Sequence, residues 1–128
     1  MDRYNPAHAP DPAQWIALGE QQRIRLVEAF HRAERHPPPN LTAHAAFHAI
    51  VENQLAEGLE SVVRAMARLA QQGLSRHESI HAIGWILAQH LYELLHATDP
   101  NSPAEAPSRY DAAIERLDAA TWRAQGTV

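Results

Sequence analysis

The chain has 128 residues, a formal net charge of −4 and no cysteine, and 45% of its residues are hydrophobic. This length favours a single globular domain that buries a real core. The absence of cysteine excludes disulfides and thiolate metal ligands, so any metal must be held by histidine, glutamate or aspartate. All 11 basic residues are arginines scattered among acidic residues, which gives no electrostatic footprint for nucleic acid.

The first dozen residues lack the basic and then apolar pattern of an export signal. The longest apolar run, 82–88, is far shorter than the roughly 20 residues needed to span a bilayer. The sequence therefore predicts a soluble cytoplasmic protein that does not associate with membranes.

Apolar residues recur at helical spacing along the whole chain, and this periodicity predicts an all-α protein. Asp11, Pro12 and Gln14 form a typical helix start, with a capping residue, a proline in the first turn and a capping-box partner. We expect this first helix to run to about His36 and to break or kink at Gly19.

The prolines 37–39 cannot continue a helix, and Asn40 can cap the next one. This second helix should end near Gly58. A third helix is expected over 59–72, with Gly73 as its stop signal.

Ser75, followed three residues later by Glu78, is a second capping-box signature. It predicts a fourth helix that continues to about His96. Four helices joined by short turns are typical of an antiparallel four-helix bundle, which we expect over 1–97.

The composition of 98–107 predicts a Pro-rich linker, followed by a C-terminal helix and tail over 108–128. This additional helix should be amphipathic, with an apolar stripe that could dock on the bundle or on a protein partner. The stripe consists of Tyr110, Ile114, Leu117 and Thr121.

Two pairs of histidines carry the strongest chemical signal. His44 and His48 are four residues apart on one predicted helix, and His77 and His81 are four apart on another. Residues at this spacing are neighbours on a helix surface, so each pair can point at one ion. Glu52 extends the first row by one turn, either as a ligand or as a group that orients a histidine. The pattern predicts a metal site between helices.

The predicted ligand set consists of imidazole and carboxylate, which suits divalent transition metals, with zinc or iron as the main candidates. If Ser75 caps its helix, His77 lies in the first turn, where the helix dipole favours the neutral, ligating form of imidazole. An ion with an open position would polarise a bound water, so hydrolytic or redox chemistry is possible. The sequence leaves open whether the protein is an enzyme.

Glu28 with His31, and Glu78 with His81, have the Glu-x-x-His spacing that di-iron carboxylate bundles use. Glu28 and His31 could therefore enlarge the site, whereas Glu78 fits better as a capping carboxylate. The order of these motifs along the chain differs from the usual di-iron scheme. A single ion is accordingly the simpler reading.

The other histidines have an ordinary interpretation, either solvated at the surface or hydrogen-bonded in a core. This applies to His8, His36, His90 and His96. It also defines the alternative function, a non-catalytic interaction module in which all histidines are structural. In that case the C-terminal helix would be the working surface, for a protein partner or for a homo-oligomer.

Two segments, NLTAHAAFHAIVENQLAEG and GLSRHESIHAIGWILAQHLYELL, resemble a widespread bacterial family of small helical proteins whose function is unknown. The resemblance covers about 4–95 and implies a shared helical fold and a shared site, with no established activity to carry over. Its most specific residues are His44, His48, Glu52, Asn53, Gln54, His77 and His81.

Overall fold

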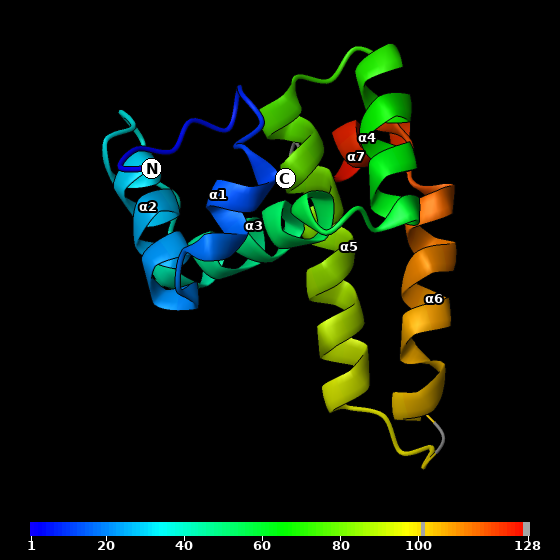
Figure 1. The fold of residues 1–128 in the computed structure, drawn as a ribbon. Helices are drawn as coiled ribbons and strands as arrows, with labels where there is room; N and C mark the ends of the chain where they lie inside the picture. The colour runs from blue at the N-terminus through cyan, green and yellow to red at the C-terminus, as the bar shows by residue number, and fades with distance from the viewer. Residues whose placement is uncertain (101, 127–128) are drawn as a thin grey trace. The chain divides into compact units, whose positions relative to one another are not determined.

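The computed structural model describes residues 1–100 and 102–126, and this part of the chain contains seven helices and no strand (Figure 1). The predicted all-α class is therefore confirmed. The helices are α1 (Pro12–Ala17), α2 (Glu20–Arg32), α3 (Leu41–Ala56), α4 (Glu60–Gln71), α5 (Arg76–Leu95), α6 (Ser102–Arg116) and α7 (Ala119–Gly126).

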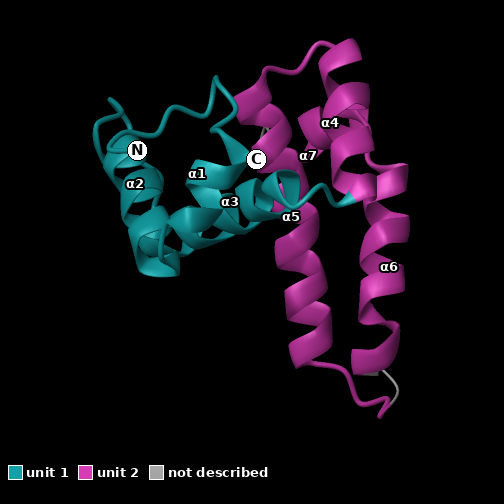
Figure 2. Ribbon diagram, viewed as in Figure 1, with its two compact units in different colours: residues 1–59 teal, residues 60–128 magenta. Residues whose placement is uncertain are grey.

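The chain divides into two compact units (Figure 2). Unit 1, Met1–Leu59, contains α1 to α3, and unit 2, Glu60–Val128, contains α4 to α7. The division of the sequence into a bundle over 1–97, a linker over 98–107 and a C-terminal part over 108–128 stays a prediction.

The start of unit 1 follows the predicted signals. Asp11 caps α1, because its carboxylate accepts a hydrogen bond of 3.0 Å from the backbone N–H of Gln14. Gly19 adopts an extended conformation between α1 and α2, so the predicted break at this glycine is confirmed. Helix α2 ends at Arg32, one turn earlier than the predicted end at His36.

Asn40 precedes α3 as predicted, but its side chain makes no capping hydrogen bond. Its backbone is instead left-handed, with φ 53° and ψ 59°. Asparagine tolerates this region better than most residues, so Asn40 turns the chain sharply after the prolines 37–39. Asn40 therefore acts through its backbone conformation, whereas the sequence predicted that it would cap the helix.

The core of unit 1 joins the N-terminal segment to all three helices. Tyr4, Trp15, Val27, Ala45 and Ala49 form one buried apolar cluster. Helix α3 contacts both α1 and α2, and thus carries its histidines next to this core.

Unit 2 is built from α4, α5 and α6, which pack against one another in all three pairs. Gly73 has a φ of +95°, a conformation that glycine adopts without strain, and ends α4 as predicted. Ser75 then caps α5, since its hydroxyl accepts a hydrogen bond of 3.1 Å from the backbone N–H of Glu78.

The C-terminal region differs from the single helix expected over 108–123, because α6 begins at Ser102 and a new helix begins at Ala119. The carboxylate of Asp118 accepts a hydrogen bond of 2.7 Å from the backbone N–H of Thr121 and caps α7. Hydrogen bonds from the backbone and from the side chain of Thr121 hold the pKa of the Asp118 carboxyl below its usual value. The local preference of aspartate for capping explains the break.

The predicted apolar stripe of this region packs within unit 2. Ile114 and Leu117 are buried. Arg68 of α4 donates hydrogen bonds to the backbone carbonyls of Ile114 (2.7 Å) and Leu117 (2.9 Å), which lie at the C-terminal end of α6. The stripe thus stabilises its own unit.

Within the described residues, no helix combines the length and the apolar character that crossing a lipid bilayer requires.

Replacing Ser75 with Ala removes the side-chain acceptor for the N–H of Glu78. We expect a loss of about 1 kcal/mol in the free energy of unfolding. Thermal unfolding followed by circular dichroism should show a Tm lowered by a few degrees, whereas Ser108→Ala, on the exposed surface of α6, should leave the Tm unchanged. Equal Tm values for both variants would contradict the capping role.

Candidate metal centre

Three histidine rings meet in unit 1. His31 comes from α2, and His44 and His48 come from successive turns of α3. The ring centroid of His31 lies 4.5 Å from that of His44 and 4.9 Å from that of His48. His31 and His48 are only 1% and 2% exposed. Unit 1 therefore contains a histidine cluster that could hold a metal ion.

The ring of His31 is fixed by its own helix. Its Nδ1 lies 2.9 Å from the backbone carbonyl of Val27, one turn earlier. A carbonyl oxygen can only accept, so Nδ1 carries the proton and donates it. The lone pair of the neutral ring is then on Nε2, the nitrogen that faces His44 at 3.1 Å.

The ring of His48 is fixed by a residue far away in the sequence. The hydroxyl of Tyr4 donates a hydrogen bond of 2.5 Å to the carboxylate of Glu52. Because a phenol has one proton, its oxygen must accept the second hydrogen bond, which spans 3.1 Å from Nδ1 of His48. His48 therefore also carries its proton on Nδ1, and its lone pair is on Nε2.

This arrangement is the one that histidine ligands of metal ions show in proteins. A ligating imidazole usually donates its other N–H to a carbonyl or a carboxylate, which sets the tautomer and the orientation of the ring. In unit 1, His31 donates to a carbonyl, and His48 donates to a hydroxyl that is itself bonded to a carboxylate. A ring nitrogen of His31 and one of His48 lie within 4.8 Å of each other.

His44, which is half-buried, is the third histidine of the cluster. If His31 accepts at Nε2, His44 donates from its own Nε2 across the 3.1 Å contact. Burial, and secondly the neighbouring imidazole of His31, lower the pKa of His44 below the ordinary value of 6.5. The ring is thus neutral at pH 7, the form that can bind a metal.

The carboxylates near the cluster differ in their partners. Glu52, 2% exposed, accepts from Tyr4 and so acts on His48 through the phenol, the orienting role that the sequence left open. Glu28 pairs with Arg32 on the same helix at 3.4 Å. Glu34, which sequence reasoning did not single out, has a carboxylate oxygen 4.0 Å from Nε2 of His31.

Unit 2 carries the second histidine pair on α5. The ring centroids of His77 and His81 are 4.2 Å apart, as expected for neighbours one turn apart. A ring nitrogen of each lies within 4.8 Å of the other, and both residues are half-buried. Glu78, between them, provides the backbone N–H that Ser75 caps.

The remaining histidines have other surroundings. His8 and His36 are exposed. His96 is exposed and bonds to the backbone carbonyl of Tyr92 at 2.8 Å, while the ring of His90 lies edge-on to Tyr110 with centroids 5.8 Å apart. These contacts fit the structural interpretation given to them from the sequence.

Tyr4 is the residue that sequence reasoning missed. It precedes the first predicted helix, so helical periodicity gives no information about its position. Asn53, one of the residues that carry the family resemblance, accepts hydrogen bonds from Trp15 (2.8 Å) and Arg23 (3.1 Å). It therefore ties α1 and α2 to α3.

Comparison with models of known protein families gives no match to the chain, and comparisons with curated proteins and with solved structures give none either. The resemblance to the bacterial family stays a prediction. The chemistry must therefore be argued from the residues themselves.

The lowered pKa of His44 makes the stability of the metal-free protein depend on pH. The unfolded chain binds a proton at His44 near pH 6.5 and the folded chain binds it only at lower pH, so folding releases a proton in this window. The free energy of unfolding should be at its full value above pH 6.5 and should fall as the pH decreases below it. Urea unfolding across this range should show the decrease, and His44→Gln should reduce it. An unchanged pH dependence in His44→Gln would contradict the assignment.

Tyr4→Phe removes the hydroxyl between His48 and Glu52 and leaves the rest of the ring in place. Loss of a donor to a buried carboxylate should lower the free energy of unfolding by about 1–3 kcal/mol. The matched control is Tyr92→Phe, because Tyr92 is 64% exposed. Urea unfolding of the metal-free variants measures both, and an equal stability of the two would contradict the role of the Tyr4 hydroxyl.

Proposed function

We propose that this protein binds one divalent transition metal ion, zinc or iron, through histidine side chains. The observation that supports this most directly is the pair of buried imidazoles, His31 and His48, whose Nδ1 protons are both engaged. In its neutral form each ring therefore has its lone pair on Nε2. Two rings fixed in this way are difficult to explain as ordinary core residues, since a leucine would fill the space without a buried polar group.

In unit 1 the proposed ligands are His31 and His48. In unit 2 the His77–His81 pair is a second candidate pair of ligands, considered by itself. His44 and Glu52 support the first two ligands, and either can enter the coordination sphere. Glu28 is left outside the set, because it pairs with Arg32.

The proposed ligand chemistry favours a nitrogen-rich site. Zinc binds imidazole nitrogen at about 2.0–2.1 Å, usually with four ligands in a tetrahedron when the site is structural. With one histidine fewer, a position stays open for a water, which zinc would activate for hydrolysis. Iron in the same ligand set would supply redox chemistry instead.

An interaction module is the alternative function. Its predicted surface, the apolar stripe of the C-terminal region, is in large part buried within unit 2, where Ile114 is 0% and Leu117 3% exposed. A protein partner or a second copy would therefore have to contact another side of α6 or α7. The metal proposal has the stronger support, because His31 and His48 are buried side by side and the Nδ1 of each is hydrogen-bonded.

The first test is the metal content of the full chain, purified without a histidine tag and measured by elemental mass spectrometry. We expect about one zinc or iron per chain. His31→Ala combined with His48→Ala should abolish stoichiometric binding. His36→Ala combined with His96→Ala changes two exposed histidines outside the cluster and should leave the metal content unchanged.

A second pair of variants separates the two histidine groups. His77→Ala with His81→Ala tests the candidate pair of unit 2. Tyr4→Phe tests unit 1, and should weaken binding there roughly 10–100-fold because it disturbs the orientation of His48. Cobalt substitution and its visible spectrum measure the change in coordination. If the His77/His81 variant binds metal as the unchanged protein does, the site is confined to unit 1. If neither double variant alters the metal content, the proposal is overturned.

A further inference from the structure

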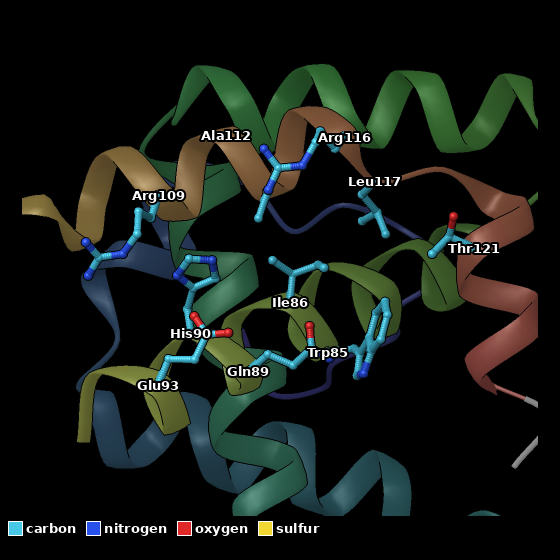
Figure 3. A pocket seen from close by; sticks show the side chains of 11 residues that line it. Trp85, Ile86, Gln89, His90, Glu93, Arg109, Ala112, Arg116, Leu117 and Thr121 are labelled. Atoms are coloured by element: carbon cyan, nitrogen blue, oxygen red, sulfur yellow. The ribbon is translucent and has the colours of Figure 1, made fainter. Parts of the chain in front are cut away.

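Unit 2 contains a pocket that has no part in the proposed metal site. It lies between α5 on one side and α6 with the start of α7 on the other, and has a volume of about 430 Å³ (Figure 3). This volume is within the range of about 300–1,000 Å³ that is typical of small-molecule sites. The pocket is lined by residues of unit 2 alone and is therefore defined without reference to unit 1.

One end of the pocket is apolar. Ile86 and Leu117 are buried, and the indole of Trp85 lies at the same end of the pocket (Figure 3). Trp85 is held by Trp122 of α7, since the two ring centroids are 6.0 Å apart at 50°. A fixed indole offers a flat surface on which an aromatic or aliphatic group can pack.

The polar side chains of the pocket are arranged on two walls. Arg109 and Arg116 come from α6, and Gln89, His90 and Glu93 face them from α5 (Figure 3). The charge of Arg109 is compensated, because its guanidinium pairs with Glu105 at 2.9 Å. Arg109 is therefore a poor candidate for binding a further anion.

Arg116 and Glu93 differ from Arg109 in this respect. Neither side chain makes a hydrogen bond or an ion pair with another residue in the described part of the chain, although both line the same pocket. They also form no ion pair with each other, so a positive and a negative group stand on opposite walls. Both are exposed, which lets a small ligand reach them from solvent.

We propose that this pocket binds a small zwitterion with an apolar body, the chemistry of a free aromatic amino acid. Its carboxylate would bind the guanidinium of Arg116, whose planar fork of donors suits two parallel hydrogen bonds to a carboxylate. Its protonated amine would bind the carboxylate of Glu93. The apolar group would pack on Trp85 and Ile86, which lie at the apolar end of the pocket.

A ligand with a single charge fits this arrangement less well. An anion would bind Arg116 but would be repelled by Glu93. A cation would bind Glu93 but would be repelled by Arg116. Only a molecule with both charges gains an interaction on each wall. The pocket should therefore bind a zwitterion more tightly than an amine or an acid of similar shape. This difference in affinity provides a direct test of the proposal.

The test uses the full chain and three probes of similar shape. These are L-phenylalanine, 2-phenylethylamine, which lacks the carboxylate, and 3-phenylpropanoate, which lacks the amine. Titration followed by NMR chemical shifts or by calorimetry gives the Kd of each. We expect L-phenylalanine to bind about tenfold or more tightly than either control, the fold-change that corresponds to one charge-assisted hydrogen bond. Equal binding of all three, or no binding of L-phenylalanine, would overturn the proposal.

Two variants assign the charges to their residues. Arg116→Gln should weaken the binding of L-phenylalanine and 3-phenylpropanoate but leave the binding of 2-phenylethylamine unchanged. Glu93→Gln should weaken the binding of L-phenylalanine and 2-phenylethylamine but leave the binding of 3-phenylpropanoate unchanged. Arg25→Gln, an exposed change in unit 1, is the matched control and should leave all three Kd values unchanged. If L-phenylalanine binds equally well to both pocket variants, it binds elsewhere. Because none of these residues is a proposed metal ligand, the metal content of the variants should stay constant, so this proposal and the metal proposal can fail separately.

Discussion

The burial of the Glu52 carboxylate is the constraint on which the arrangement of unit 1 depends. A carboxyl group that is 2% exposed must have hydrogen-bond partners, because burying a polar group without them costs several kcal/mol. Tyr4 provides one of these partners from a segment 48 residues earlier in the chain. The N-terminal segment is thereby attached to α3 by a polar contact in addition to its apolar packing on Trp15.

The same contact determines the chemistry of the neighbouring imidazole. A phenol that gives its proton to a carboxylate has only its lone pairs left for His48. The ring must then place its proton toward Tyr4, and its basic nitrogen faces the other way. His31 reaches the same state by a simpler route, through a carbonyl of its own helix. Two independent hydrogen bonds thus orient two neighbouring rings in the same way.

The sequence predicts the helices well where local chemistry decides them. Asp11, Gly19 and Ser75 act at the chain positions where capping or chain-breaking rules place them, because these effects extend over only a few residues. The left-handed backbone of Asn40 and the α6–α7 break are less predictable. For Asn40 the sequence predicts a cap through its side chain, and at Asp118 a local cap competes with a continuous helical pattern. The boundaries there depend on which local preference is stronger.

The candidate site is predictable only in part, for a related reason. Spacing on one helix brings His44 next to His48, and His77 next to His81, without any knowledge of the fold. The contacts of His31 with α3 and of Tyr4 with His48 depend on how separate segments pack, and periodicity carries no information about that. Sequence reasoning therefore finds the rows of candidate ligands but does not find the residues that orient them.

The tryptophans give each unit its own optical signal. Trp15 is fully buried, with its N–H donated to Asn53 and its ring 5.6 Å from that of Tyr4. Its emission should be blue-shifted and should respond to any quenching ion that reaches the nearby imidazoles. Trp85 and Trp122 are only 6.0 Å apart, so their excited states couple and should produce a paired near-ultraviolet dichroic band. The folding of each unit can thus be followed separately by the spectroscopic signal of its own tryptophans, without attached labels.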